Sequence, residues 1–168
     1  MHFQPCTLND LDEIFRLYEQ AIDFQKTKTS NVWLGFSREM VINEIKERRK
    51  WKIVMGNKVA CVFTTIFSDP IIWKEKNVDP SIYIHRISTN AEFRGQGFVK
   101  AIVNWCKANA PETGIKYIRL DTAANNPGLV NYYQKCGFTY LGDTYVDESD
   151  DLPAHYQNAS FALFEIKL

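Results

Sequence analysis

One short stretch of the chain combines residue types that suit the binding of a small anion. A predicted strand, residues 81–89, leads into a turn that contains Arg94, Gly95 and Gly97. A helical pattern begins directly after this turn, and the exposed N–H groups and dipole of a helix start attract negative charge. Glycine lets the backbone approach a phosphate closely, and the guanidinium of Arg94 adds a charged fork. The pattern indicates a phosphate site, although a turn that only redirects the chain fits the two glycines equally well.

Two nucleotide-binding patterns can be compared with this turn. A P-loop requires Gly-x-x-x-x-Gly-Lys-Ser/Thr, which the chain lacks. A dinucleotide fingerprint requires a third glycine where Lys100 stands, although Asp121 ends the next predicted strand, where a ribose-binding acid would lie. The turn also lies in mid-chain and not at the head of a doubly wound domain. Dinucleotide binding stays an alternative at this stage.

The elements that must position the turn follow from the hydrophobic periodicity. Four segments carry apolar residues at helical spacing, and their predicted starts are Asn9, Ser37, Phe98 and Asn126. In the second of these helices Val41 and Ile45 are expected to face the core, while Glu44 and the charged residues 46–49 face solvent.

Short segments of apolar and β-branched residues predict the strands. They are 2–8, 51–55, 58–67, 81–89, 117–122 and 160–167, with loops predicted at 68–80 and in the polar, acidic segment 142–158. The element order β-α-α-β-β-β-α-β-α-β-β, which counts one further strand after the last helix, predicts an α/β fold with a mixed sheet in one domain, residues 1–168.

Composition limits the classes of protein that the chain can represent. Its 168 residues include 20 Lys and Arg against 20 Asp and Glu, so the formal net charge is zero and no nucleic-acid partner is expected. No apolar run is long enough for a membrane span, and the N-terminus lacks the pattern of a secretion signal. The cysteines lack the spacing of a zinc site or a disulfide framework, which favours a cytoplasmic protein with free thiols: Cys6, Cys61, Cys106 and Cys136.

Two segments carry a resemblance to a known family. Residues 94–99 resemble the Arg/Gln-x-x-Gly-x-Gly/Ala motif of the GNAT superfamily of N-acetyltransferases, and residues 126–138 resemble its Asn…Tyr-x-x-x-Gly-Phe helix. The element order is similar too, so the resemblance covers nearly the whole chain. It implies the GNAT-like acyl-CoA N-acyltransferase fold, with a mostly antiparallel central sheet flanked by helices. It also implies acetyl-CoA as co-substrate, no metal, an amine acceptor, direct transfer, and a monomer or homodimer.

The resemblance assigns coenzyme contacts to the turn, to the strand before it and to the start of the last helix. These positions are Ile87, Thr89, Arg94, Gly95, Gln96, Gly97, Phe98, Val99 and Asn126. Backbone N–H groups of the turn would hold the pyrophosphate, and the strand would pair with the pantetheine arm. Val99 stands where the family usually has Gly or Ala, so its N–H is kept but its methyl groups are expected to crowd the phosphate.

Acetyl transfer to an amine needs a neutral nucleophile and a proton for the departing thiolate. The imidazole of His85, with an ordinary pKa near 6.5, suits removal of the ammonium proton, and alternation along the strand predicts that it shares a face with Ile87 and Thr89. A purely structural histidine is the alternative. The resemblance implies that Tyr133 donates a proton to the thiolate; an aromatic ring that only packs is the alternative there.

The acceptor side is the least defined by the sequence. The resemblance places Trp33 and Phe36 in a segment that lines the acceptor site in relatives, and Tyr83 lies on the predicted face of His85. The acidic residues of 147–151 suit a cationic amine, although a solvated loop is the usual role of such a run. A non-catalytic acyl-CoA-binding or regulatory module of the same fold is the alternative function.

Overall fold

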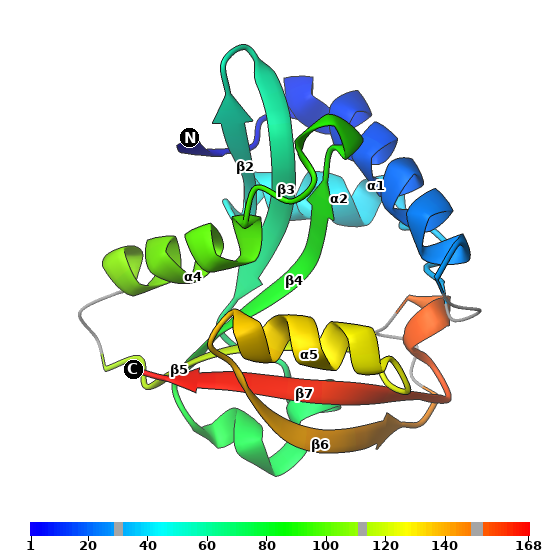
Figure 1. The fold of residues 1–168 in the computed structure, drawn as a ribbon, viewed down its shortest axis with the longest axis vertical. Coiled ribbons are helices and arrows are strands. Elements are labelled where there is room, and N and C mark those ends of the chain that lie inside the picture. The colour runs from blue at the N-terminus through cyan, green and yellow to red at the C-terminus, as the bar shows by residue number, and fades with distance from the viewer. Residues whose placement is uncertain (29–31, 111–113, 149–152) are drawn as a thin grey trace. The chain divides into compact units, whose positions relative to one another are not determined.

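Seven strands and five α-helices make up most of the part of the chain that the structure describes. Figure 1 shows the computed structural model, which describes residues 1–28, 32–110, 114–148 and 153–168. The helices are α1 (Leu11–Lys26), α2 (Arg38–Lys46), α3 (Pro70–Trp73), α4 (Phe98–Asn109) and α5 (Pro127–Lys135). The strands are β1 (His2–Pro5), β2 (Lys50–Met55), β3 (Lys58–Ile66), β4 (Ser81–Thr89), β5 (Tyr117–Ala123), β6 (Thr139–Val146) and β7 (Ala159–Lys167).

The strands form one mixed sheet in the order β1-β2-β3-β4-β5-β7-β6. The pairs β1–β2, β2–β3, β5–β7 and β6–β7 are antiparallel, whereas β4 pairs in parallel with β5, Ser81 opposite Tyr117 and Ile84 opposite Leu120. This confirms the predicted α/β fold with a mostly antiparallel sheet. Within the described residues no helix is both long and apolar enough to cross a membrane.

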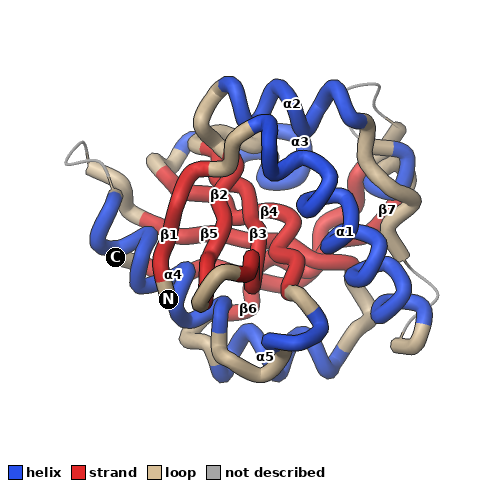
Figure 2. The backbone as a smooth tube through the Cα atoms, turned by 90° about the horizontal axis from the view of Figure 1, so that it is seen from above, coloured by secondary structure: helices blue, strands red, loops and turns tan. Residues whose placement is uncertain are grey.

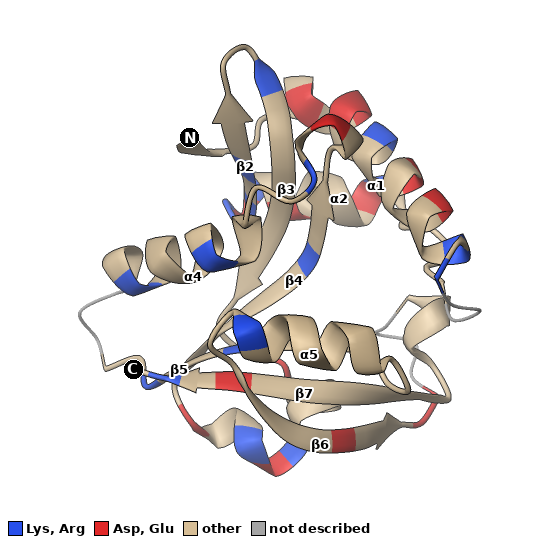
Figure 3. Ribbon diagram, viewed as in Figure 1, with Lys and Arg blue, Asp and Glu red and all other residues tan. Residues whose placement is uncertain are grey.

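The chain divides into two compact units, and each is described by itself. The first comprises Met1–Thr65 and Arg86–Phe98, and the second comprises Ile66–His85 and Val99–Leu168. In the first unit α1 and α2 pack through one apolar cluster on β3, and Figure 2 shows both helices beside the strands. The buried members of that cluster are Cys6, Leu11, Ile14, Leu17, Tyr18, Val41, Ile45 and Val62. Charges of both signs alternate on the outer face of α1 (Figure 3).

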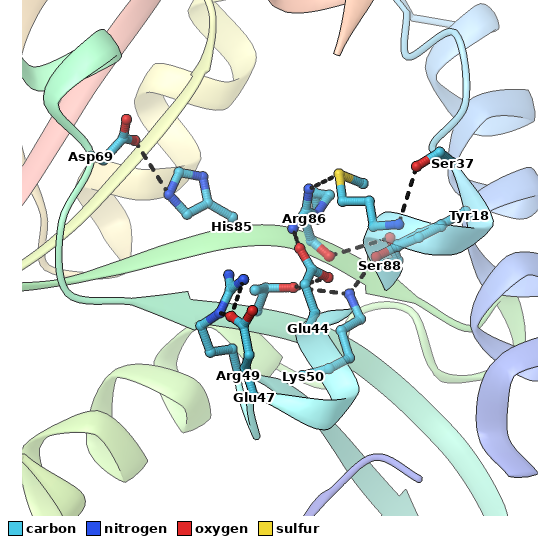
Figure 4. A network of polar contacts seen from close by, with 12 residues as sticks. Tyr18, Ser37, Glu44, Glu47, Arg49, Lys50, Asp69, His85, Arg86 and Ser88 are labelled. Atoms are coloured by element: carbon cyan, nitrogen blue, oxygen red, sulfur yellow. Dashed lines mark hydrogen bonds and ion pairs between the residues drawn. The ribbon is translucent and has the colours of Figure 1, made fainter. Parts of the chain in front are cut away.

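The prediction that Glu44 faces solvent is wrong. Its side chain is 3% exposed and forms an ion pair with Arg86 of β4 (Figure 4). Helical periodicity placed Glu44 beside charged neighbours, but a buried carboxylate is stable where a cation compensates it.

Arg86 also interrupts the regular alternation of β4. Its φ is +50°, in the left-handed region that residues with a Cβ rarely adopt. Because side chains alternate only along regular extended backbone, the predicted common face of His85, Ile87 and Thr89 does not continue across this residue.

In the second unit, Arg119 of β5 organises the segment before β4. Its guanidinium donates to Asp79 Oδ2 and Glu165 Oε2, each at 3.1 Å, and to the hydroxyl oxygen of Tyr83 at 3.3 Å. The guanidinium also stacks over the indole of Trp73, 4.8 Å from the ring centroid. A cation that is 2% exposed is thereby fully compensated, and it fixes the loop onto the sheet.

Two boundaries differ from those predicted. The segment 68–80, predicted as a loop, contains α3, whose start is capped by Asp69 and carries Pro70 in its first turn. Strand β6 runs to Val146 and enters the segment predicted as a polar loop, because it pairs with β7 along its length, Thr144 opposite Phe161 and Val146 opposite Ala159. Its polar residues face solvent at the edge of the sheet, where apolar periodicity gives a poor signal.

Candidate functional site

The turn after β4 is open on the side that a ligand would approach. Gly95 and Gly97 have φ values of +83° and +72°, and no described atom lies within 4 Å of a Cβ added to either. Residues 94–97 are exposed, and the first turn of α4, described in full, contains no acidic residue. Lysine is the only charged residue type along α4 (Figure 3). A helix start with accessible backbone and no opposing charge suits an anion.

Side-chain contacts fix the approach to this turn. The Oδ1 atom of Asn90 accepts from the N–H of Glu92, while its Nδ2 donates to the carbonyl of Val59 in β3 at 3.1 Å. The N–H of Asn90 donates to the carbonyl of Ala60 at 2.9 Å. Asn90 is 3% exposed, so the turn starts from an anchored residue.

The guanidinium of Arg94, which was predicted to bind the phosphate, lies against α1 instead. Its guanidinium stacks on the ring of Phe24 in α1, 4.2 Å from the centroid, with Nη2 3.5 Å from the carbonyl of Gln20. The backbone of the turn is therefore the part that faces solvent. Val99 is 5% exposed, so its methyl groups are buried.

His85 lies between two buried carboxylates of the second unit. Its Nε2 is 3.4 Å from Oδ2 of Asp69, and its Nδ1 is 3.7 Å from Oδ1 of Asp121 (Figure 4 shows the contact with Asp69). The three side chains are 12%, 8% and 3% exposed respectively. The other oxygen of Asp69 caps α3 by accepting from the N–H of Ile72.

Burial raises the pKa of Asp121 from 3.8 to about 6, the nearby carboxylate of Asp69 adds to the rise, and His85 opposes it. A carboxyl group with this pKa titrates close to the range in which imidazole does, so the cluster can exchange a proton near neutral pH.

The same three side chains each offer one possible metal-ligand atom, and these atoms lie within 4.8 Å of one another. However, the two carboxylates face different ring nitrogens. A metal would need both carboxylates to converge on one nitrogen, whereas an imidazolium, which donates from both nitrogens, fits the arrangement as it stands.

Tyr133 of α5 packs against aromatic neighbours of the second unit. Its ring centroid is 5.1 Å from that of Phe164 and 6.1 Å from that of Phe138. Burial raises the pKa of Tyr133 above its ordinary value, and the proximity of Tyr132 and Asp121 raises it further. The phenol stays protonated at neutral pH, as a proton donor must.

Asn126 begins α5 as the sequence predicts. Its Oδ1 accepts from the N–H of Leu129 at 3.1 Å, and Pro127 follows in the first turn. The cap fixes the orientation of Asn126 through Oδ1, and its Nδ2 takes no part in the cap.

The three predicted acceptor residues have different environments. Trp33 and Phe36, both partly buried, lie beside Tyr18 in the first unit, with ring centroids 5.1 Å apart. Tyr83 is fully buried and accepts from Arg119, so its contacts are those of a core residue. Asp147 and Glu148 are exposed, and the other predicted acidic residues, Asp150 and Asp151, lie outside the described residues.

Sequence reasoning missed two of the groups that surround His85. Asp69 lay in a predicted loop, although the Asp-Pro pair, typical of a helix start, signals the cap. Asp121 was considered only as a ribose ligand, and its burial against His85 removes that role.

Residues 46–138, more than half of the chain, match the model of the acetyltransferase (GNAT) family. The chain belongs to this family. GNAT proteins are acyltransferases that use acetyl-CoA, so the exposed turn and the family identity agree.

Individual relatives are distant in sequence. The uncharacterized N-acetyltransferase YesJ of Bacillus subtilis is 24% identical over 151 residues, which cover 82% of this chain and 81% of that protein. A GNAT acetyltransferase structure from Streptococcus agalactiae superposes with a TM-score of 0.77 at 18% identity, covering 99% of this chain and 95% of that one. The spermidine N-acetyltransferase of Vibrio cholerae, in complex with CoA and spermine, gives 0.64 at 16% identity, covering 99% and 94%.

Proposed function

We propose that this GNAT protein moves an acetyl group from acetyl-CoA directly to a primary amine of a small molecule or peptide. The observation that carries the proposal is the open, glycine-containing turn at the start of α4, because it fits the pyrophosphate of a coenzyme. Acetyl-CoA supplies an acetyl group already activated as a thioester. The protein has to hold it, take a proton from the amine and provide one for the departing sulfur.

The first unit holds the coenzyme in this proposal. Backbone N–H groups from Gly95 to Phe98 bind the pyrophosphate, and the positive φ values of the glycines keep that backbone accessible. Ile87 and Thr89 present β4 backbone to the pantetheine arm. Because the guanidinium of Arg94 lies on Phe24, its side chain is not assigned to the phosphate.

Groups of the second unit handle the protons. His85 takes the ammonium proton on its unprotonated ring nitrogen, which leaves the lone pair on the amine. Because both ring nitrogens face buried carboxylates, the proton passes through a water in this proposal. Tyr133, protonated at neutral pH, provides the proton for the thiolate. Asn126 offers its amide to the coenzyme arm, and its cap holds it in place.

The acceptor is proposed to be a cationic amine. Trp33 and Phe36 supply an aromatic wall in the first unit, and Tyr83 is left out because it is fully buried. The complex of the Vibrio cholerae relative with spermine makes polyamines the first compounds to test. A cytoplasmic location, one domain over residues 1–168, and a monomer or homodimer stay predictions.

The test is release of free thiol from acetyl-CoA with a panel of polyamines, other alkyl amines and peptides, in the wild type and in Tyr133→Phe. We expect amine-dependent thiol release that falls in the variant. Binding of acetyl-CoA with no transfer to any amine would show a non-catalytic binding module instead. A thermal shift with NAD but not with acetyl-CoA would support the dinucleotide alternative.

A further inference from the structure

Each ring nitrogen of His85 faces a carboxylate from a different element. Asp69 precedes α3 and faces Nε2, whereas Asp121 lies in β5 and faces Nδ1. Both distances exceed those of a well-formed hydrogen bond, so a small movement of the ring or of a carboxylate is needed to form one.

The two carboxylates need a cation near them. Oδ2 of Asp69 and Oδ1 of Asp121 are buried and make no hydrogen bond among the described residues. Each carboxylate has other contacts, but a buried oxygen that accepts no hydrogen bond costs free energy, and the imidazole of His85 is positioned between these two oxygens. Proton uptake by His85 would give each carboxylate an N–H donor, because imidazolium donates from both nitrogens.

We propose, on the basis of the function above, that Asp69 and Asp121 are positioning residues that orient His85 and stabilise the imidazolium formed when it accepts the acceptor's proton. In that step an N–H bond of the ammonium breaks, an N–H bond forms on the imidazole, and the electron pair stays on the amine. With both carboxylates ionised, the net charge of the cluster changes from −2 to −1. A cluster with this charge selects an acceptor that arrives as a cation.

The environment of Asp121 is consistent with this role. The titratable groups that face it are His85 on β4, Asp69 before α3 and Tyr133 on α5, and the indole of Trp73 is a further neighbour. Burial raises the pKa of Asp121, His85 lowers it and Asp69 raises it, so a positive charge on His85 stabilises the ionised carboxylate. By the same interaction, the two carboxylates favour proton uptake by His85.

The test compares Asp69→Asn and Asp121→Asn with Asp79→Asn as a control. Asparagine at position 69 still caps a helix, so that variant keeps the start of α3. Asp79 is a carboxylate of the same unit whose partner is Arg119, so its variant measures the general cost of losing a carboxylate there. The pKa of His85 is followed by NMR in the full-length protein, and the pH dependence of kcat/KM is followed with a polyamine.

Removing either carboxylate should lower the pKa of His85 by about one unit and move the acidic limb of kcat/KM equally to lower pH. We expect the plateau to fall about tenfold or more. The control should move neither the NMR titration nor the limb. If one of the two variants does not fold, the other still gives both readouts.

An unchanged His85 titration in the folded variants would overturn the inference. So would tight binding of Zn²⁺ to the wild type that both variants lose, since the cluster would then be a metal site. A lowered pKa of His85 in variants of a protein that acetylates no amine would overturn the proposed function and the role in transfer. It would still show that the two carboxylates interact with His85.

Discussion

The carboxylate of Glu44 in α2 and the guanidinium of Arg86 in β4 form an ion pair that is almost completely buried, with side chains 3% and 11% exposed. The pair has further support on both sides. The hydroxyl of Thr64 donates to Glu44 at 3.3 Å, and the guanidinium lies over the ring of Phe36, 5.2 Å from its centroid. Because Arg86 has a positive φ, these contacts also hold an unfavourable backbone conformation in the strand.

Glu44→Ala should therefore lower the free energy of unfolding by about 3–5 kcal/mol, because Arg86 would stay buried without its counter-charge. Urea denaturation at neutral pH measures the loss. Glu47→Ala is the matched control, since its ion pair with Arg49 is largely exposed and should cost no more than about 1 kcal/mol. Equal losses of unfolding free energy in the two variants would show that the buried pair stabilises the protein no more than the exposed pair does.

This ion pair illustrates which features of the fold were predictable. Helix starts at Ser37 and Asn126 were predicted correctly because a cap and the N–H that donates to it lie within one turn of chain. The burial of Glu44 was not predicted, because its partner Arg86 lies in a strand far away in the sequence. Local periodicity does not show which strand packs beside the helix. For the same reason, no pattern in the sequence signals the positive φ of Arg86.

The candidate site divides in the same way. The turn at Gly95 and Gly97 is contiguous in sequence, so its exposed backbone could be predicted from residue types alone. The surroundings of His85 depend on Asp69 and Asp121, which come from separate segments and meet only in the folded sheet. Tyr83 was misjudged for a similar reason, because its buried partner Arg119 lies on a neighbouring strand.

Replacing Gly97 should weaken coenzyme binding. Gly97→Ala forces a Cβ into a backbone with φ of +72°, at a cost of about 1 kcal/mol, and a shift of the turn would misalign its N–H groups. We expect the Kd for acetyl-CoA, measured by calorimetry, to rise about tenfold. Gly56→Ala in the β2–β3 turn, where φ is +58°, imposes similar strain away from the turn and should leave the Kd unchanged. Identical Kd values for both variants and the wild type would argue against a phosphate site here.

Tyr133→Phe should lower kcat without weakening acetyl-CoA binding. Loss of the hydroxyl removes a proton donor, and general-acid groups contribute about 100-fold or more to rates. Tyr132→Phe changes the adjacent tyrosine, which is 42% exposed, and should retain kcat. Single-turnover measurements with saturating acetyl-CoA separate the chemical step from binding. If Tyr133→Phe retained full kcat, the ring would have a packing role only.

Asp121 should make the folded protein less stable as pH rises through the weakly acidic range. Burial raises its pKa from 3.8 to about 6, so between these values the folded state binds more protons at this site than the unfolded chain does. Its contribution to stability is therefore fully present below about pH 4 and is lost as pH rises through about 6. The shift corresponds to about 3 kcal/mol.

Asp121→Asn removes this titration, so its free energy of unfolding relative to the wild type should increase by that amount between pH 4 and pH 7. Taking the difference between the two proteins removes the contributions of groups that titrate alike in both. Asp143→Asn makes the same substitution at an exposed position of the edge strand β6 and serves as the comparison. Urea denaturation at several pH values supplies the curves. A constant difference for Asp121→Asn would contradict the raised pKa of Asp121 in the folded protein.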